Sequence, residues 1–321
     1  MADTVTAVRL TLGCAQIGNL GTAMSDETAH AILEAAWAGG IRRFDTAPHY
    51  GLGLSERRLG RFLATKPREQ FVVSTKVGRL LVPVDAAESE EQDDEGFAVP
   101  RTHRRRWDFS ADGIAASFDA SRERLGLDRI DILYLHDPEE HVDEALTGGV
   151  RGLAALKDAG AVGEIGVGNK DVDLLEEMIT RASFDRIMLA GRYTLLDQSA
   201  DRSLLSACHR RGVTVDNAAV FNSGVLASSP IVDGARFEYA AAPPEIIARA
   251  RKIDELLRVH GMTLPVAALA FARRPSVVGA VVVGAERPDQ VESLLDRWRT
   301  DVSADAWLAL EEAGLIGRPH R

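Results

Sequence analysis

The sequence predicts an α/β protein, a (β/α)8 barrel of the TIM type, and three observations support this. Short apolar runs alternate with helical patterns along the chain, which is typical of βα units that build a parallel sheet. The runs are continuous and do not alternate with polar residues, as expected for strands buried on both faces. Eight such units account for most of the 321 residues, and eight units close a barrel.

The first half of the chain contains four of the expected strands. Ser25 and Asp26 are cap candidates for an alanine-rich helix that runs to about Ala38, and the pair Gly39 and Gly40 ends it. Ser55 opens a short helix to about residue 63, and Ser110 is the expected cap of a later helix that runs to about residue 125. The four expected strands are residues 10–17, 41–45, 71–76 and 130–136.

The second half repeats the same alternation. Its four expected strands are residues 162–168, 184–190, 213–218 and 277–283. A loop rich in Gly, Ser and Pro occupies residues 222–244. The expected helices are residues 142–159, a helix from 171, and 199–211, 245–258, 264–272, 288–298 and 304–313.

A doubly wound dinucleotide-binding fold is the main alternative for such a pattern. That fold carries closely spaced glycines in the turn after its first strand. Here the corresponding turn contains Gly13, Gly18 and Gly21, and their spacing does not match. We therefore expect a single barrel domain over residues 1–321.

A long insertion interrupts the regular pattern at about residues 79–109. Residues 84–96 are mostly acidic, and residues 101–107 turn basic, with Arg104, Arg105 and Arg106 in a row. These arginines are expected to pair with the acidic run. A loop of this length inside a compact domain is usually either functional or disordered. Both a lid over a site and a mobile, solvated insertion stay open.

Composition excludes several classes of function. The net charge is −10, which argues against a nucleic-acid partner. The apolar runs are short and broken by charges, so no membrane span or membrane partner is expected. No basic region precedes an apolar one at the N-terminus, so a cytoplasmic location is expected. Cys14 and Cys208 are expected to be buried hydrophobes in a reducing compartment.

Three expected strands each end in an ionisable side chain. Asp45, Lys76 and His136 stand at these ends, and Tyr50 follows in the loop after Asp45. The carboxyl ends of barrel strands form the face on which barrel active sites are found. We therefore expect these side chains to form one site.

These residue types suit proton transfer at a C–O oxygen. A free phenol has a pKa of about 10, and a neighbouring ammonium lowers that value. A carboxylate keeps the lysine charged and fixed, and a neutral histidine can hydrogen-bond the substrate oxygen. No nucleophile with an adjacent base and no cluster at metal-ligand spacing is evident, so no metal is expected.

At this point the chain resembles the aldo-keto reductases over essentially its whole length. The resemblance rests on several motifs. They are Phe44-Asp45-Thr46-Ala47 with Tyr50-Gly51, Ser55-Glu56 with Leu59-Gly60, Ser74-Thr75-Lys76, Leu133-Tyr134-Leu135-His136, Gly166-Val167-Gly168-Asn169 and Val283-Gly284-Ala285 with Gln290. The resemblance implies a barrel that binds a nicotinamide dinucleotide without a Rossmann domain. It also implies a catalytic tetrad of Asp45, Tyr50, Lys76 and His136.

A narrower resemblance points to the aldose 1-dehydrogenase branch of that family. Its motifs are residues 50–60, 76–81, 108–113, 190–198 and 221–226. The branch includes dehydrogenases of D-threo-aldoses (L-fucose), L-galactose and pyridoxal, whose substrates form cyclic hemiacetals. The implied reaction is oxidation of the hemiacetal carbon to a lactone, with an aldose as the leading substrate.

The resemblance also implies cofactor contacts. Many family members place a Ser before the Asn after the fifth strand and a Gln in the sixth strand, whereas this chain has Gly168 and Ala190. A carboxylate at Glu286 favours NAD, and Arg287 leaves NADP open. The implied contacts are Asn169, Phe221, Asn222, Ser223, Gly224, Leu226, Gly284, Ala285, Glu286, Arg287 and Gln290.

Substrate contacts are expected from the loops. The candidates are His49, Arg79, Trp107 and Asn222. Three alternatives to an aldose dehydrogenase stay open: a pyridoxal 4-dehydrogenase, an NADPH-dependent aldehyde or ketone reductase, and a nucleotide-sensing binding subunit. The sequence leaves the oligomeric state open.

Overall fold

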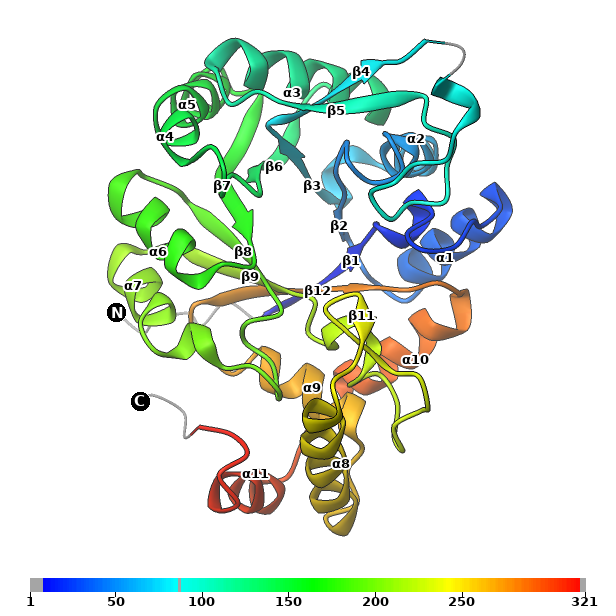
Figure 1. Ribbon diagram of the computed structural model, residues 1–321, viewed down its shortest axis with the longest axis vertical. Helices are drawn as coiled ribbons and strands as arrows, with labels where there is room; N and C mark the ends of the chain where they lie inside the picture. The colour runs from blue at the N-terminus through cyan, green and yellow to red at the C-terminus, as the bar shows by residue number, and fades with distance from the viewer. Residues whose placement is uncertain (1–7, 86–87, 318–321) are drawn as a thin grey trace. The chain divides into compact units, whose positions relative to one another are not determined.

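The computed structural model describes residues 8–85 and 88–317, and its main sheet is a closed parallel barrel, as predicted (Figure 1). Its strands follow one another in the order β1-β12-β9-β8-β7-β6-β3-β2. Their bounds are β1 (Arg9–Gly13), β2 (Arg43–Asp45), β3 (Val72–Val77), β6 (Ile130–His136), β7 (Val162–Asn169), β8 (Arg186–Ala190), β9 (Thr214–Ala218) and β12 (Val278–Gly284).

Helices separate the strands along the chain, and several begin at the predicted caps. The Ser25 hydroxyl accepts a hydrogen bond from the backbone N–H of Thr28, and the Ser110 hydroxyl accepts one from Gly113. The helices are α1 (Asp26–Ala38), α2 (Leu54–Leu63), α3 (Ala111–Leu125), α4 (Val142–Glu144), α5 (Val150–Asp158), α6 (Val172–Arg181), α7 (Leu204–Arg211), α8 (Pro244–Val259), α9 (Leu264–Ala272), α10 (Pro288–Arg299) and α11 (Ala304–Glu312).

The chain divides into two compact units. Unit 1 contains Met1–Leu10, Met188–Val283 and Ser293–Arg321, and unit 2 contains Thr11–Ile187 and Gly284–Glu292. Asp45, Tyr50, Lys76 and His136 all belong to unit 2. The organisation of residues 1–321 as a single domain stays a prediction.

The strands of unit 2 align the predicted site residues. Asp45 is opposite Ser74 in the β2–β3 register, and Lys76 is opposite Tyr134 in the β3–β6 register. Because the strands are parallel, their carboxyl ends lie at the same edge of the sheet. His136 is the last residue of β6 and therefore reaches that same edge.

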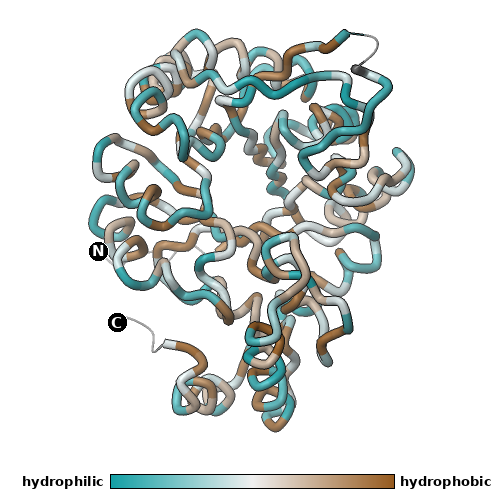
Figure 2. Tube along the Cα trace, viewed as in Figure 1, coloured by the Kyte–Doolittle hydropathy of each residue, from teal (hydrophilic) through white to brown (hydrophobic). Residues whose placement is uncertain are grey.

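The insertion is more regular than the sequence pattern indicated. Its two ends pair as an antiparallel hairpin of β4 (Arg79–Pro83) and β5 (His103–Trp107), which packs on α3 (Figure 1). Figure 2 shows that β4 is hydrophobic, whereas β5 is hydrophilic, so β5 lacks the apolar pattern from which a strand is predicted. The expectation of a wholly irregular segment is therefore wrong for these strands.

Several other boundaries differ from the predicted ones, two of them by four residues or more or by a change of helix type. The first strand ends at Gly13 instead of residue 17, and a short 3-10 helix (Gln16–Gly18) follows it. The helix expected over residues 142–159 contains a π-helical segment, Ala145–Gly149, between α4 and α5. A Cβ on Gly148 would lie 2.6 Å from the backbone oxygen of Phe109, so this segment approaches the neighbouring backbone closely.

Unit 1 contains β9 and, except for Gly284, β12, which pair in parallel, and α8, which packs against α11. A small hairpin of β10 (Arg236–Phe237) and β11 (Ala240–Ala241) lies within the predicted loop. Within residues 8–85 and 88–317, no single helix is long and apolar enough to cross a membrane. The bent pair of α8 and α9 passes that test together, on length and composition alone.

Candidate active site

Lys76 and Asp45 form a buried ion pair at the carboxyl edge of the sheet in unit 2. Each side chain is 3% exposed, and Lys76 Nζ lies 2.7 Å from Asp45 Oδ2. Lys76 also donates to the backbone oxygen of Thr46, and the Ser74 hydroxyl donates to Asp45 Oδ1. Buried charges are tolerated where they are paired and hydrogen-bonded in this way. The sequence prediction that Asp45 holds Lys76 agrees with this geometry.

Tyr50 lies beside this pair. Lys76 Nζ is 4.7 Å from the centre of the Tyr50 ring. Burial alone lowers the pKa of Lys76, but the charge of Asp45 and the interaction with the Tyr50 side chain outweigh it, so the net pKa is raised. Lys76 is therefore an ammonium at neutral pH, placed next to a phenol.

A close backbone approach fixes the loop that carries Tyr50. Gly51 has a φ of +62°, and a Cβ there would lie 2.1 Å from the backbone oxygen of Gly18. Only glycine fits at this position. The Ser55 hydroxyl also donates to the backbone oxygen of Cys14, which ties the start of α2 to the end of β1.

Two neutral imidazoles border Tyr50. The ring of His136 lies 6.1 Å from the Tyr50 ring, and the ring of His49 lies 5.7 Å from that of His136. Burial lowers the pKa of His136 well below its usual value, and the charges of Arg79 and Lys76 lower it further. Burial, with Arg79 and Arg105, lowers the pKa of His49 to about 2. His136 Nδ1 is buried and has no hydrogen-bond partner among the described residues.

One substrate candidate of the insertion, Arg79, reaches Asp137, the residue next to His136. Arg79 Cζ is 4.2 Å from the centre of the Trp107 ring, and the Arg79 guanidinium donates to Asp137 Oδ2 at 2.5 Å. Asp137 Oδ2 is 3.5 Å from His136 Nε2. Arg79 and Trp107 were predicted from the sequence, whereas Asp137 was not, although it directly follows the strand-end histidine.

The insertion also supplies Phe97 and Arg105, which were not predicted as site residues. The Phe97 ring lies 5.9 Å from the Tyr50 ring and 5.1 Å from the His49 ring, edge-on to the latter. Arg105 Nε donates to His49 Nδ1 at 2.8 Å. Arg105 pairs with Asp93 and lies 3.5 Å from Glu95, so this arginine meets the acidic run as predicted, whereas Arg106 lies 3.6 Å from Asp108, outside that run.

Some of the predicted cofactor contacts belong to unit 2. Asn169 is buried, donates to Glu139 and accepts from the backbone N–H of Asp171. Gln290 accepts a hydrogen bond from the backbone N–H of Glu286 at 2.7 Å. Arg287 forms two contacts of 3.0 Å with Asp289. The remaining members of this group are Gly284 and Ala285, at and just after the end of β12.

The other predicted cofactor contacts belong to unit 1. Asn222 and Ser223 both have positive φ angles, 46° and 59°, and Gly224 follows at 108°. Asn222 is buried, and its side-chain oxygen has no partner among the described residues. A buried acceptor without a donor fits a ligand that brings one, so the residues present are compatible with a nicotinamide dinucleotide. Phe221 and Leu226 flank this turn and are joined by a backbone hydrogen bond.

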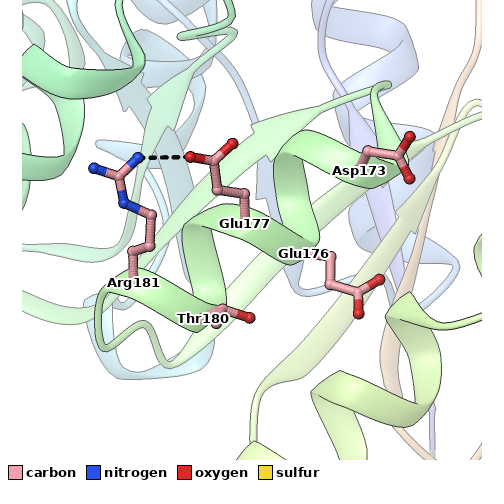
Figure 3. Close-up of a pocket in the computed structure, with 5 residues that line it drawn as sticks. All are labelled: Asp173, Glu176, Glu177, Thr180 and Arg181. Carbon is pink, nitrogen blue, oxygen red and sulfur yellow. Dashed lines mark hydrogen bonds and ion pairs between the residues drawn. The ribbon is translucent and has the colours of Figure 1, made fainter.

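A surface hollow along α6 has a different character. It is lined by Asp173, Glu176, Glu177, Thr180 and Arg181, and Figure 3 shows that all five come from this helix. Arg181 pairs with Glu177 at 2.6 Å. None of the predicted site residues lines it, so we assign it no role in the reaction.

The part of the chain that is described contains no group of three or more His, Cys, Asp or Glu side chains arranged to hold a metal ion. Cys14 and Cys208 are both buried and not disulfide-bonded. Burial raises the pKa of the Cys14 thiol, so it is protonated at neutral pH.

The strands form a closed parallel barrel, and their carboxyl ends carry a buried Asp–Lys pair, a tyrosine and a neutral histidine. These features define a barrel oxidoreductase. The model of the aldo/keto reductase family matches residues 9–314, and the chain belongs to this family of NAD(P)-dependent enzymes. The family was predicted from the strand-end motifs, and that prediction is confirmed.

Two named relatives are similar to this chain over almost its whole length. The chain is 48% identical to the D-threo-aldose 1-dehydrogenase of a Pseudomonas species, over 96% of this chain and 94% of that protein. It is 38% identical to the pyridoxal 4-dehydrogenase of Microbacterium luteolum, over 97% and 95%. Its fold is similar to that of the glycerol dehydrogenase of Gluconobacter oxydans, with a TM-score of 0.78, 21% identity and coverage of 99% and 98%.

Proposed function

We propose that this protein oxidises the anomeric carbon of a cyclic aldose to a lactone, with NAD as the oxidant. The observation that carries the chemistry is the buried contact of 2.7 Å between Lys76 and Asp45, next to Tyr50. The relative that is 48% identical and acts on D-threo-aldoses supports the substrate class.

Each of the four residues has a distinct role in this proposal. Tyr50 takes the proton of the anomeric hydroxyl, since the neighbouring Lys76 ammonium stabilises the phenolate. Asp45 keeps Lys76 charged and in place. His136 is neutral and orients the hydroxyl by a hydrogen bond.

When bound, the nicotinamide ring supplies the acceptor for the hydride on the anomeric carbon. The electron pair of the C–H bond leaves with that hydride, the O–H proton goes to Tyr50, and the C–O single bond becomes the C=O bond of the lactone. We propose Asn169, Gly284, Ala285, Glu286 and Gln290 as residues of unit 2 that hold the dinucleotide. Phe221, Asn222, Ser223, Gly224 and Leu226 stay predicted contacts.

NAD is the preferred cofactor in this proposal. Arg287, the basic candidate for a 2′-phosphate, is engaged by Asp289 through two contacts of 3.0 Å. The adjacent Glu286 carboxylate can accept hydrogen bonds from a ribose diol and repels a 2′-phosphate. A small-molecule substrate and a cytoplasmic location complete the proposal.

Oxidation of pyridoxal is the second candidate, because a relative that is 38% identical over 97% of this chain acts on pyridoxal. Pyridoxal also forms a cyclic hemiacetal, so the same four side chains suit its oxidation. The two candidates therefore differ in the groups that surround the reacting carbon.

The deciding experiment follows the near-ultraviolet absorbance of reduced nicotinamide. Purified protein is mixed with NAD or NADP and with L-fucose, D-arabinose, L-galactose or pyridoxal. Turnover of a sugar with NAD supports the proposal, and turnover of pyridoxal alone moves the protein to the second candidate. Oxidation of NADPH by simple aldehydes, without any turnover of the four compounds, contradicts both.

A further inference from the structure

Beside His136 lies an ion pair that the proton-transfer roles do not use. Asp137 Oδ2 accepts from the Arg79 guanidinium at 2.5 Å and lies 3.5 Å from His136 Nε2. One carboxylate oxygen therefore stands next to the histidine nitrogen that can meet the reacting hydroxyl. The carboxylate and the guanidinium add an acceptor and donors at this position.

The backbone at Asp137 is held in an unusual conformation. Its φ is +44°, in the left-handed region that most residues avoid. The Asp137 N–H donates to the backbone oxygen of Gly168 at 3.0 Å, which ties the residue to the end of β7. Non-glycine residues held in this region cluster at functional sites. The position of the carboxylate is thus set by the backbone and not by side-chain freedom alone.

Arg79 is also fixed. Its side chain is 11% exposed, lies over the Trp107 ring at 4.2 Å and retains a buried Nε without a partner among the described residues. The turn before it requires Gly78, whose φ is +102° and whose added Cβ would lie 2.2 Å from the Phe109 ring. In contrast, the Asp137 side chain is 31% exposed and remains open to a ligand.

We propose that Asp137 and Arg79 bind the hydroxyl on the carbon adjacent to the anomeric carbon, so that the site selects aldoses with a free 2-hydroxyl. This inference rests on the proposed function. His136 binds the anomeric hydroxyl, and the Asp137 carboxylate, 3.5 Å from its Nε2, accepts from the next hydroxyl of the sugar. The 2-hydroxyl is bound and is not changed in the reaction.

Such a pair discriminates by charge-assisted hydrogen bonds. A site built to hydrogen-bond a hydroxyl disfavours the analogue that lacks it, because the polar groups of the site are then left unpaired. Pyridoxal carries no hydroxyl on the carbon bonded to its hemiacetal carbon. The pair therefore favours aldoses over pyridoxal.

The test compares kcat/KM for two matched substrate pairs: L-fucose with 2-deoxy-L-fucose, and D-arabinose with 2-deoxy-D-ribose. In the unchanged protein we expect the 2-hydroxy member to be preferred by about tenfold or more, the effect of losing one charge-assisted hydrogen bond. In Asp137→Gly, which suits the positive φ, the preference falls towards one. Asp137→Asn keeps the shape and the backbone conformation and should lose part of the preference.

Asp131→Asn is the matched control. Asp131 lies near the other end of β6 and also pairs with an arginine, Arg68, at 2.8 Å. We expect this variant to keep the preference for the 2-hydroxy substrate. A purely structural role of Asp137 would lower kcat/KM equally for both members of each pair and leave their ratio unchanged.

The outcomes separate the two proposals. If the unchanged protein oxidises none of L-fucose, D-arabinose and L-galactose with either cofactor, the proposed function fails. If it oxidises them but shows no preference over the 2-deoxy sugars, or if Asp137→Gly keeps that preference, the aldose function stands and the role of Asp137 and Arg79 is overturned.

Discussion

At the scale of single residues, the site depends on which side chains carry charge. Lys76 is charged and fully paired, whereas His49 and His136 are buried and neutral. An ammonium beside a phenol favours loss of the phenol proton, and neutral imidazoles donate hydrogen bonds without adding charge. This combination favours proton transfer through Tyr50.

Replacing Tyr50 by Phe tests that role directly. The ring and its contacts with Phe97 and His136 stay, but the hydroxyl is lost. We expect kcat to fall by about 10²- to 10⁴-fold, the usual contribution of a positioned acid or base. Binding of NAD, measured by fluorescence titration, should change little. Full activity in Tyr50→Phe would exclude this residue as the proton acceptor.

The two neutral histidines also predict a dependence of stability on pH. Their pKa values are depressed in the folded protein, whereas a histidine in the unfolded chain has its ordinary pKa of about 6.5. Below that pH, the unfolded chain therefore binds more protons than the folded protein. Their neutral state is therefore compatible with folding above that pH, and stability is lost as the pH falls below it. For each histidine, the free energy of unfolding should fall by up to about 1.4 kcal/mol per pH unit.

Urea unfolding at pH 7.5, 6.0 and 5.0 measures this dependence. His49→Asn should reduce the loss of stability on acidification, because it removes one buried neutral imidazole. His30→Asn is the control, since it replaces a histidine whose side chain is 58% exposed instead of buried. Identical pH dependence in His49→Asn and in the unchanged protein would contradict the assignment of His49.

At the scale of elements, the insertion is held over the site by a buried ion pair. The Arg105 side chain is 4% exposed and pairs with Asp93, whose side chain is fully buried. The same segment brings Phe97 against Tyr50 and His49. The sequence left two alternatives open for the insertion, a lid and a mobile segment, and these contacts favour the lid.

Arg105→Leu should loosen this segment. The change leaves the Asp93 carboxylate buried and unpaired, and breaking a buried pair in this way costs about 3–5 kcal/mol. We expect faster limited proteolysis within residues 88–103. Mass spectrometry of the fragments measures where and how fast the chain is cut. Arg106→Leu is the control from the same strand, because the Arg106 side chain is 62% exposed. Equal cleavage rates in the two variants would show that Arg105 does not hold the segment.

At the scale of the whole molecule, the sequence predicted most of the barrel, because strands and capped helices follow from local patterns. Ser25 and Ser110 cap the helices that their positions indicated. The β4–β5 hairpin was missed, because β5 consists of His, three Arg and Trp, which lack the pattern of a strand. Its pairing depends on residues twenty or more positions away in the chain.

The same reason separates the site residues that were predicted from those that were missed. Asp45, Lys76 and His136 were predicted from their places at the ends of apolar runs. Phe97 and Arg105 meet Tyr50 and His49 only through a fold-back of the insertion, which no local pattern encodes. Asp137 could have been found, since it follows His136 directly and precedes a proline.

A ligand that binds only the folded state raises the free energy of unfolding. The stability of the whole molecule in the presence of NAD or NADP therefore measures which cofactor it binds more tightly. The gain is about 2.7 kcal/mol at 100 times the Kd. NAD should therefore raise the melting temperature more than NADP at equal concentration.

Asp289→Asn should narrow that difference, since it releases the Arg287 guanidinium to attract a 2′-phosphate. Asp296→Asn, which changes a similarly exposed carboxylate near Arg299, should not. A larger shift with NADP in the unchanged protein would reverse the proposed preference, because Arg287 would then bind the phosphate despite Asp289.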